Sequence, residues 1–96
     1  MELRTRLNTA LKDAMKAKEA DRLGTLRLIN AAIKDRDIDV RATGQDGVDE
    51  AGVLAILAKM VKQRQESAKA YEEGGRLELA EKELSEITII EDFLPK

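Results

Sequence analysis

The chain has 96 residues, 38% of them charged, with a formal net charge of −2 and neither cysteine nor histidine. Disulfides, thiolate metal sites, cysteine nucleophiles and histidine general bases are therefore all excluded. Aromatic residues make up only 2% of the chain, whereas aliphatic residues are abundant. This balance favours helices over strands, and the length suits one small domain covering residues 1–96.

No apolar run reaches the roughly 20 residues that span a bilayer. The first ten residues, MELRTRLNTA, lack the apolar segment of a signal peptide. From these two features we expect a cytoplasmic protein that does not associate with membranes.

Four segments place apolar residues at helical spacing, which predicts a small antiparallel bundle of about four helices. The first helix is expected over residues 2–18 and the second over residues 22–40, with Asp21 as the N-cap of the second. Gly24 stands inside the second helix and Gly52 inside the third. A glycine in a helix interior costs about 1 kcal/mol relative to alanine, which indicates close packing or a local irregularity at both positions.

The third helix is expected over residues 49–73, beginning at an N-cap, Asp49, and ending before a pair of glycines that can take the left-handed conformation. Arg64 lies in the middle of its apolar stripe, one helical step beyond Met60. A charge at that position must find a partner or reach solvent. We therefore expect Arg64 to be at least partly buried and bonded to a carboxylate or a helix-end carbonyl.

The fourth helix is expected over residues 76–93. Its predicted inward stripe consists of Leu77, Ala80, Leu84, Ile87, Ile90 and Leu94. Ile89 and Phe93 are four residues apart on the opposite side, and Phe93 is the only phenylalanine. The pair is predicted to be an exposed docking patch that supports weak self-association.

Charge is distributed in blocks along the chain. Residues 1–34 carry eight lysines and arginines against four carboxylates, and residues 59–71 carry four against one. One interpretation is that helices of opposite charge pack as neighbours, and the other is that the basic blocks bind phosphates. Under the second interpretation the expected RNA contacts are Lys59, Lys62, Arg64, Lys69, Lys12, Lys16, Arg27 and Lys34.

These residues are expected to form a basic surface that joins the lysines of the third helix to part of the first or second helix, with Lys12 and Lys16 as the candidates on the first. The scarcity of aromatic residues argues against stacking on single-stranded bases. Structured RNA, recognised through shape and backbone, fits the composition better.

No catalytic constellation is visible in the sequence. Ser67 and Lys69 are two residues apart on a helix, so their side chains diverge and cannot form a Ser–Lys dyad. The glycine-bearing loop at residues 41–47 lacks the Gly-Lys-Ser/Thr ending of a phosphate-binding loop. We therefore expect no enzyme activity, no metal ion and no cofactor.

Two stretches carry a resemblance to the YqeY family, RLGTLRLINAAIK and KMVKQRQESAKAYEEGGRLELAEKELSEITIIEDFLP. That family shares its fold with the C-terminal tail of the GatB subunit of the Glu-tRNA(Gln)/Asp-tRNA(Asn) amidotransferase. The resemblance implies an all-helical fold and, for the amidotransferase tail, contact with tRNA. Chains of the family usually continue past the FLP motif, so this chain is expected to correspond to the first helical subdomain, with the second absent.

Two functions follow from this resemblance. The first is a non-catalytic, tRNA-associated accessory module, linked at family level to carbon–nitrogen ligases that use glutamine as amido donor. The alternative is a protein docking module of an amidotransferase or aminoacyl-tRNA synthetase complex, without RNA affinity of its own. The expected partners are accordingly tRNA or those proteins.

Overall fold

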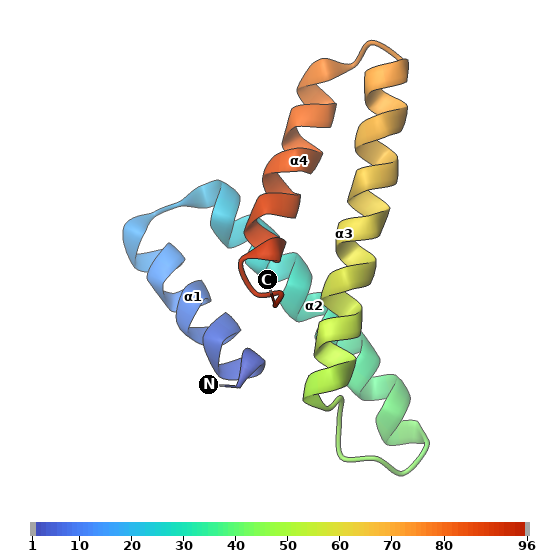
Figure 1. Cartoon of the computed structure of the whole chain (residues 1–96). Helices are drawn as coiled ribbons and strands as arrows, with labels where there is room; N and C mark the ends of the chain where they lie inside the picture. Colours follow the sequence, from blue (N-terminus) through green and yellow to red (C-terminus); the bar gives the residue numbers. More distant parts are fainter. Residues whose placement is uncertain (1, 96) are drawn as a thin grey trace.

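In the computed structural model, which describes residues 2–95, the chain forms four α-helices and no strand within that range (Figure 1). The helices are α1 (Leu3–Ala17), α2 (Ala20–Ala42), α3 (Glu50–Glu73) and α4 (Leu77–Glu91). Each bound lies within two residues of the one expected from the sequence. The prediction of a small all-α bundle is confirmed.

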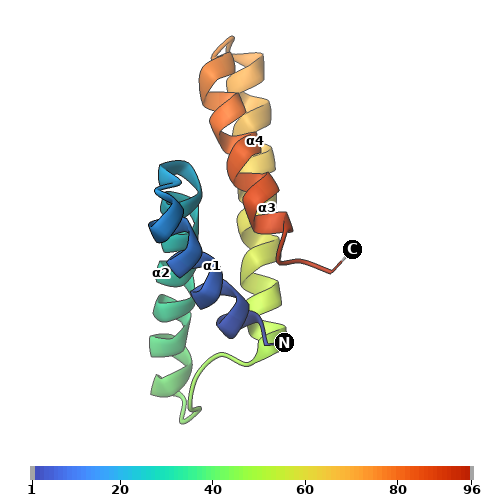
Figure 2. The ribbon, with the colours of Figure 1, turned by 90° about the vertical axis from the view of Figure 1, so that its left-hand side faces the viewer.

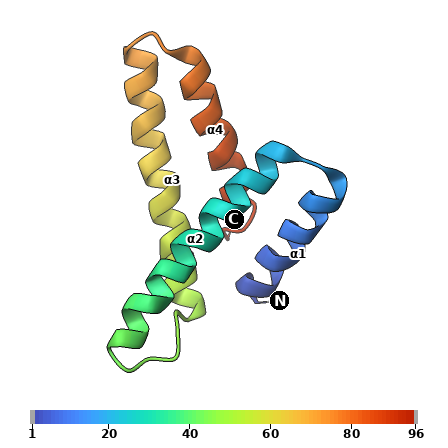
Figure 3. The same ribbon diagram turned by 180° about the vertical axis from the view of Figure 1, so that it is seen from behind.

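The helices are arranged as two antiparallel hairpins, α1–α2 and α3–α4. Figure 2 shows the two hairpins as separate layers that face each other. The most extensive contact is between α3 and α4, and α2 touches all three other helices. From behind, α2 crosses the lower part of the α3–α4 hairpin, whose tip projects beyond it (Figure 3).

The turn between α1 and α2 is tighter than the sequence indicated. Lys18 takes a left-handed conformation with φ of 58°, and the Glu19 N–H donates to the Ala14 carbonyl at 3.0 Å. This closure lets α2 begin at Ala20. The prediction that Asp21 is the N-cap is therefore wrong, because Asp21 lies in the first turn of α2.

The start of α3 follows the prediction. The Asp49 carboxylate accepts a hydrogen bond from the Gly52 N–H at 2.8 Å, which confirms Asp49 as the N-cap. A Cβ atom at Gly52 would collide with the side chain of Val48, so this glycine serves close packing. At the other end of α3, Gly75 supplies the left-handed residue with φ of 75°, because glycine has no steric penalty there.

The core between the layers is almost wholly aliphatic. It is assembled from every helix and from the segment after α4, and most of its members follow the predicted inward stripes. Its buried residues are Leu3, Leu7, Ala14, Leu26, Ile29, Ile33, Val48, Val53, Leu57, Met60, Val61, Ile87, Ile90 and Phe93.

An ion pair joins α1, α2 and the loop before α3. The Arg4 guanidinium donates to both oxygens of Asp37, at 2.6 and 3.1 Å, and also to the Val48 carbonyl at 2.9 Å. The Val48 N–H in turn donates to Asp37 at 2.8 Å. The Arg4 and Val48 donors lower the pKa of Asp37 from 3.8 to about 2. A further bond, from the Leu3 N–H to the Glu50 carboxylate at 2.6 Å, ties the start of α1 to α3.

This arrangement makes stability depend on pH. Because the pKa of Asp37 is lower in the folded chain than its ordinary value, its contribution is complete above about pH 5 and is lost as pH falls toward 2. The shift corresponds to about 2 kcal/mol. We expect Asp37→Asn to lose about that much stability at pH 7 and almost none near pH 2, as measured by urea unfolding.

Asp39→Asn is the matched control, because Asp39 is an exposed carboxylate on the same helix. It should retain the acid dependence of the wild type. An unchanged pH profile in Asp37→Asn would contradict the assigned role of the ion pair.

Candidate functional site

The lysines predicted to bind RNA on α3 are all exposed. Lys59, Lys62 and Lys69 face solvent, and none of them forms an ion pair with another residue in the range 2–95. Lys62 and Lys69 are seven residues apart and therefore share one side of α3. Three unpaired ammonium groups along one helix are free to meet an anionic surface.

Lys59 lies beside α2 and not beside α1. It lines a shallow hollow of about 350 Å³ together with Asp35, Arg36 and Asp39 of α2. Two carboxylates thus share this hollow with the lysine, although no ion pair forms. The hollow contains no residue of α1, so it does not connect Lys59 to Lys12 or Lys16. It places Lys59 beside Arg36 of α2, the other helix that the expectation allowed.

The other predicted contacts lie on the first hairpin. Lys12 and Lys16 are exposed on α1, and Arg27 and Lys34 are exposed on α2. None of the four forms an ion pair within the described part of the chain. The structure thus distributes the predicted basic residues over three helices, and their role in RNA binding stays a prediction.

Arg64 differs from these residues because its guanidinium has partners inside the protein. It donates to Glu86 of α4 at 3.2 Å and to the Met60 carbonyl at 3.2 Å. Its side chain is only 15% exposed and that of Glu86 16%. The expectation that Arg64 is partly buried and paired is confirmed. This pairing links α3 to α4 and leaves Arg64 poorly placed to contact a phosphate.

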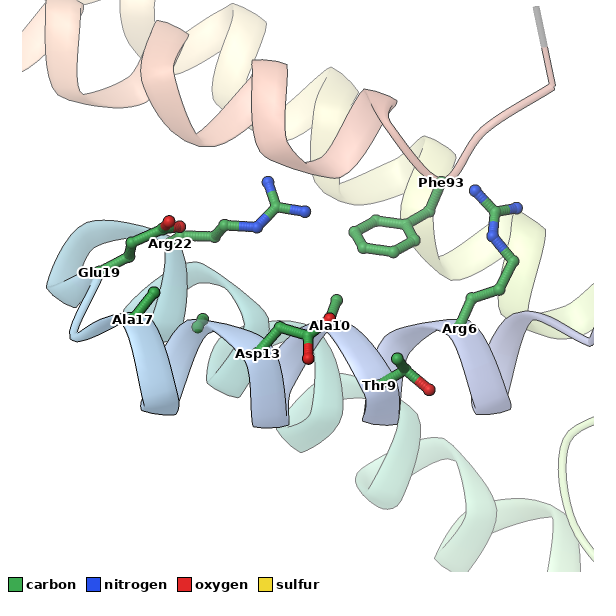
Figure 4. A pocket seen from close by; sticks show the side chains of 9 residues that line it. Arg6, Thr9, Ala10, Asp13, Ala17, Glu19, Arg22 and Phe93 are labelled. Carbon is green, nitrogen blue, oxygen red and sulfur yellow. The ribbon is translucent and has the colours of Figure 1, made fainter.

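Phe93 does not belong to an exposed patch. It is 5% exposed, and Figure 4 shows its ring directed from the end of α4 toward α1, between Arg6 and Arg22. The Arg6 guanidinium lies 5.5 Å from the ring centre, a distance suited to a cation–π contact. The neighbouring residue, Asp92, accepts from Arg6 through its carbonyl at 3.1 Å and from Arg22 through its carboxylate at 3.3 Å.

The docking patch predicted at Ile89 and Phe93 is therefore corrected. Phe93 closes the core beneath the cleft of Figure 4, and Ile89 is half-buried. The physical reason is the contact with the first hairpin, which draws the segment after α4 inward. Self-association itself is untested, but this pair does not present the exposed aromatic ring on which that expectation depended.

The exposed apolar side of α4 lies elsewhere. Leu77 and Leu84 were expected to face the core, but they are 62% and 46% exposed. The inward positions are Ala80, Ile87 and Ile90. Because α4 carries apolar residues around most of its circumference, its spacing alone did not determine which side faces the core.

The ion pair at Asp37 was missed at the sequence level, although a signal was present. Asp37 follows Ile29 and Ile33 at intervals of four residues, so it continues the apolar stripe of the second helix. This is the same signature that identified Arg64. No three acidic side chains of residues 2–95 come together in a way that could hold a metal ion. In the same range, no helix is long and apolar enough to cross a membrane.

The protein is thus a small all-α protein made of two packed helical hairpins. Its candidate functional site is an exposed surface that carries unpaired lysines on α3 and exposed leucines on α4. The chain belongs to the YqeY family, because the family model described as Yqey-like protein matches residues 4–96. The resemblance inferred from the sequence is thereby confirmed.

Similar curated proteins come from yeasts. The chain is 38% identical over 92% of its length to the protein named Altered inheritance of mitochondria protein 41, mitochondrial, of Lachancea thermotolerans. It is 39% identical over 92% of its length to the protein of that name from Meyerozyma guilliermondii. It covers 46% and 44% of those two proteins, so the chain spans about half the length of these curated relatives.

The expected cytoplasmic location is contradicted by these relatives, since their names describe them as mitochondrial. That expectation rested on the lack of a long apolar run and of a signal-peptide segment. Neither test detects a mitochondrial transit peptide, which is amphipathic and not continuously apolar.

The contribution of the Arg64–Glu86 ion pair to the free energy of unfolding can be tested directly. We expect Arg64→Ala to destabilise the protein by about 3 kcal/mol, because it leaves the largely buried Glu86 carboxylate without its partner. Denaturant unfolding gives this value. Adding Glu86→Ala should recover part of the loss, and simple additivity of the two substitutions would contradict a direct interaction.

The burial of Phe93 gives a second stability test. We expect Phe93→Ala to cost about 3 kcal/mol, because it removes a ring from the core. Leu84→Ala is the control, since Leu84 is 46% exposed and its loss should cost less than about 1 kcal/mol. Equal melting temperatures for the two variants would show that Phe93 is not part of the core.

Proposed function

We propose that this chain is a non-catalytic accessory module that associates with tRNA and acts in mitochondria. Family membership supports the proposal through the resemblance to the tRNA-contacting tail of the amidotransferase. The mitochondrial setting is taken from the names of the relatives. The absence of histidine and cysteine from the sequence supports a binding role over a catalytic one.

The proposal that the chain binds RNA depends mainly on one observation. Lys59, Lys62 and Lys69 project from one helix and have no intramolecular ion pair among residues 2–95. A lysine that stabilises the fold would be expected to reach a carboxylate. These three instead keep their ammonium groups in solvent, where neutralising a phosphate releases bound counterions and favours association.

The strength of such an interaction is limited by the acidic remainder of the protein. The chain has a formal net charge of −2, so long-range attraction to RNA is weak. Three phosphate contacts would give a salt dependence of about 40-fold in affinity between 50 and 200 mM salt. Binding should therefore be modest and steeply dependent on salt.

A protein docking function is the second candidate, and one observation favours it. Leu77, Leu79 and Leu84 of α4 are at least 40% exposed. Leu77 and Leu84 are seven residues apart and therefore share one side of α4, whereas Leu79 lies on another side. Exposed apolar side chains along one side of a helix are typical of surfaces that other proteins cover. Under this reading an amidotransferase or synthetase subunit would be the partner, and the isolated chain would not bind RNA.

We expect Lys59→Glu/Lys62→Glu to reduce affinity for bulk tRNA at least tenfold, because two phosphate contacts are replaced by repulsion. A filter-binding titration at 50 and 200 mM salt is the measurement. The melting temperature should stay nearly unchanged, since both residues are exposed and unpaired.

Arg76→Glu/Lys82→Glu is the matched control, because it makes the same change in net charge at exposed positions outside α3. It should bind tRNA more tightly than the α3 variant. Equal affinity of the wild type and the α3 variant would remove the RNA function from this face and favour the docking function.

A further inference from the structure

A groove separates the first half of α2 from the first half of α4. The two helices diverge from their crossing point, as Figures 1 and 3 show. Between them lies a hollow of about 610 Å³, with Thr25 buried on the α2 side. Its walls carry Gly24 and Leu28 from α2 and Ser85 from α4, so its surface mixes apolar and polar groups.

The charge in this groove is predominantly negative. Asp21, Glu78 and Glu81 line it and form no ion pair within the described residues, and Lys82 is the one basic residue of its lining. Asp21 and Glu78 lie in the first turns of α2 and α4, where a carboxylate complements the helix dipole. Glu81 has no such role in the fold.

Gly24 gives an independent indication that the groove receives another helix. It lies inside α2, yet a Cβ atom added there would meet nothing within 4 Å. Packing within the chain therefore does not explain this glycine, in contrast to Gly52. Glycine in a helix allows a second helix to approach its backbone closely. Leu28, one turn further along, is 46% exposed beside it.

The complementary chemistry is present on α1 of the same protein. Lys12, Met15 and Lys16 share one outward side of α1, because they are three and four residues apart. Met15 is 53% exposed, and neither lysine forms an ion pair within residues 2–95. This side of α1 therefore presents one apolar residue, Met15, between two positive charges. Met15 can pack against Leu28, and the two lysines can pair with the carboxylates of the groove.

We infer that the groove between α2 and α4 binds the Lys12–Met15–Lys16 face of α1 from a second copy of the chain. Each copy then contributes one groove and one helix, so the contact can occur twice around a two-fold axis and close as a dimer. Because Gly24 has no side chain, α1 of the second copy can approach the backbone of α2 closely. The carboxylates of the groove then fix its orientation by pairing with Lys12 and Lys16.

The inference goes beyond the proposed function, although Lys12 and Lys16 were also predicted to contact RNA. The experiment contains no nucleic acid, so its failure would leave the tRNA proposal intact. Sedimentation of the complete chain is followed at concentrations up to about 1 mM, at the weak end of specific association. We expect concentration-dependent dimer formation at low salt and its loss near 0.5 M salt, because exposed charges are then screened.

The variant Gly24→Ala distinguishes an effect on dimer formation from an effect on folding stability, because the two should change in opposite directions. The added methyl group should raise the melting temperature by about 4 °C, because alanine is the better helix former and the space is open in the free chain. The same methyl group should weaken the dimer at least tenfold. Ile38→Ala is the control, an exposed position about 21 Å further along α2, and should leave the dimer unchanged.

A charge exchange identifies the partner surface. Glu81→Lys and Lys16→Glu should each weaken the dimer, and the two together should restore it, because the pair is re-formed with reversed signs. A wild type that stays monomeric at every concentration would overturn the inference. A dimer that neither Gly24→Ala nor the charge exchange affects would overturn it equally, because the copies would then meet through another surface.

Discussion

The pairing of Arg4 with Asp37 is the interaction on which the relative placement of the two hairpins depends. It holds α1 against α2, and through Val48 it also fixes the loop that leads into α3. Arg4 lies 33 residues from Asp37 and 44 residues from Val48, so no local propensity brings α1 to them. A bidentate guanidinium–carboxylate contact is directional, and it therefore selects one register where aliphatic packing alone tolerates several.

The pair of Arg64 and Glu86 performs a similar task in the second hairpin. Replacing both partners of a buried ion pair by apolar residues often changes stability little, because removing two charges from water offsets most of their attraction, whereas removing one partner is costly. The effect of such a pair is greater on specificity, since any sliding of α4 along α3 would separate the charges. The two pairs thus specify the rotation and register of helices whose cores consist mainly of interchangeable aliphatic residues.

The sequence predicted the helices well because apolar residues recur at helical spacing in all four and because Asp49 and the glycine pair mark the ends of α3. It also predicted the burial of Arg64, because a charge within an apolar stripe is visible locally. On α4 it placed Ala80, Ile87 and Ile90 correctly, but it extended the inward side to Leu77 and Leu84, because their side chains are as apolar as those that are buried. The partner of Asp37 was invisible for a different reason, because Arg4 lies 33 residues away in the chain.

The projecting tip of the α3–α4 hairpin has a consequence for how the protein fluctuates. Toward this tip the fully buried side chains of α3 and α4 are small, Ala68 and Ala80, and Tyr71 is half-buried. Because little apolar area is buried at this tip, we expect its backbone amides to exchange with solvent through local fraying while the junction of the hairpins stays closed. Hydrogen exchange should therefore distinguish a slowly exchanging base from a rapidly exchanging arm.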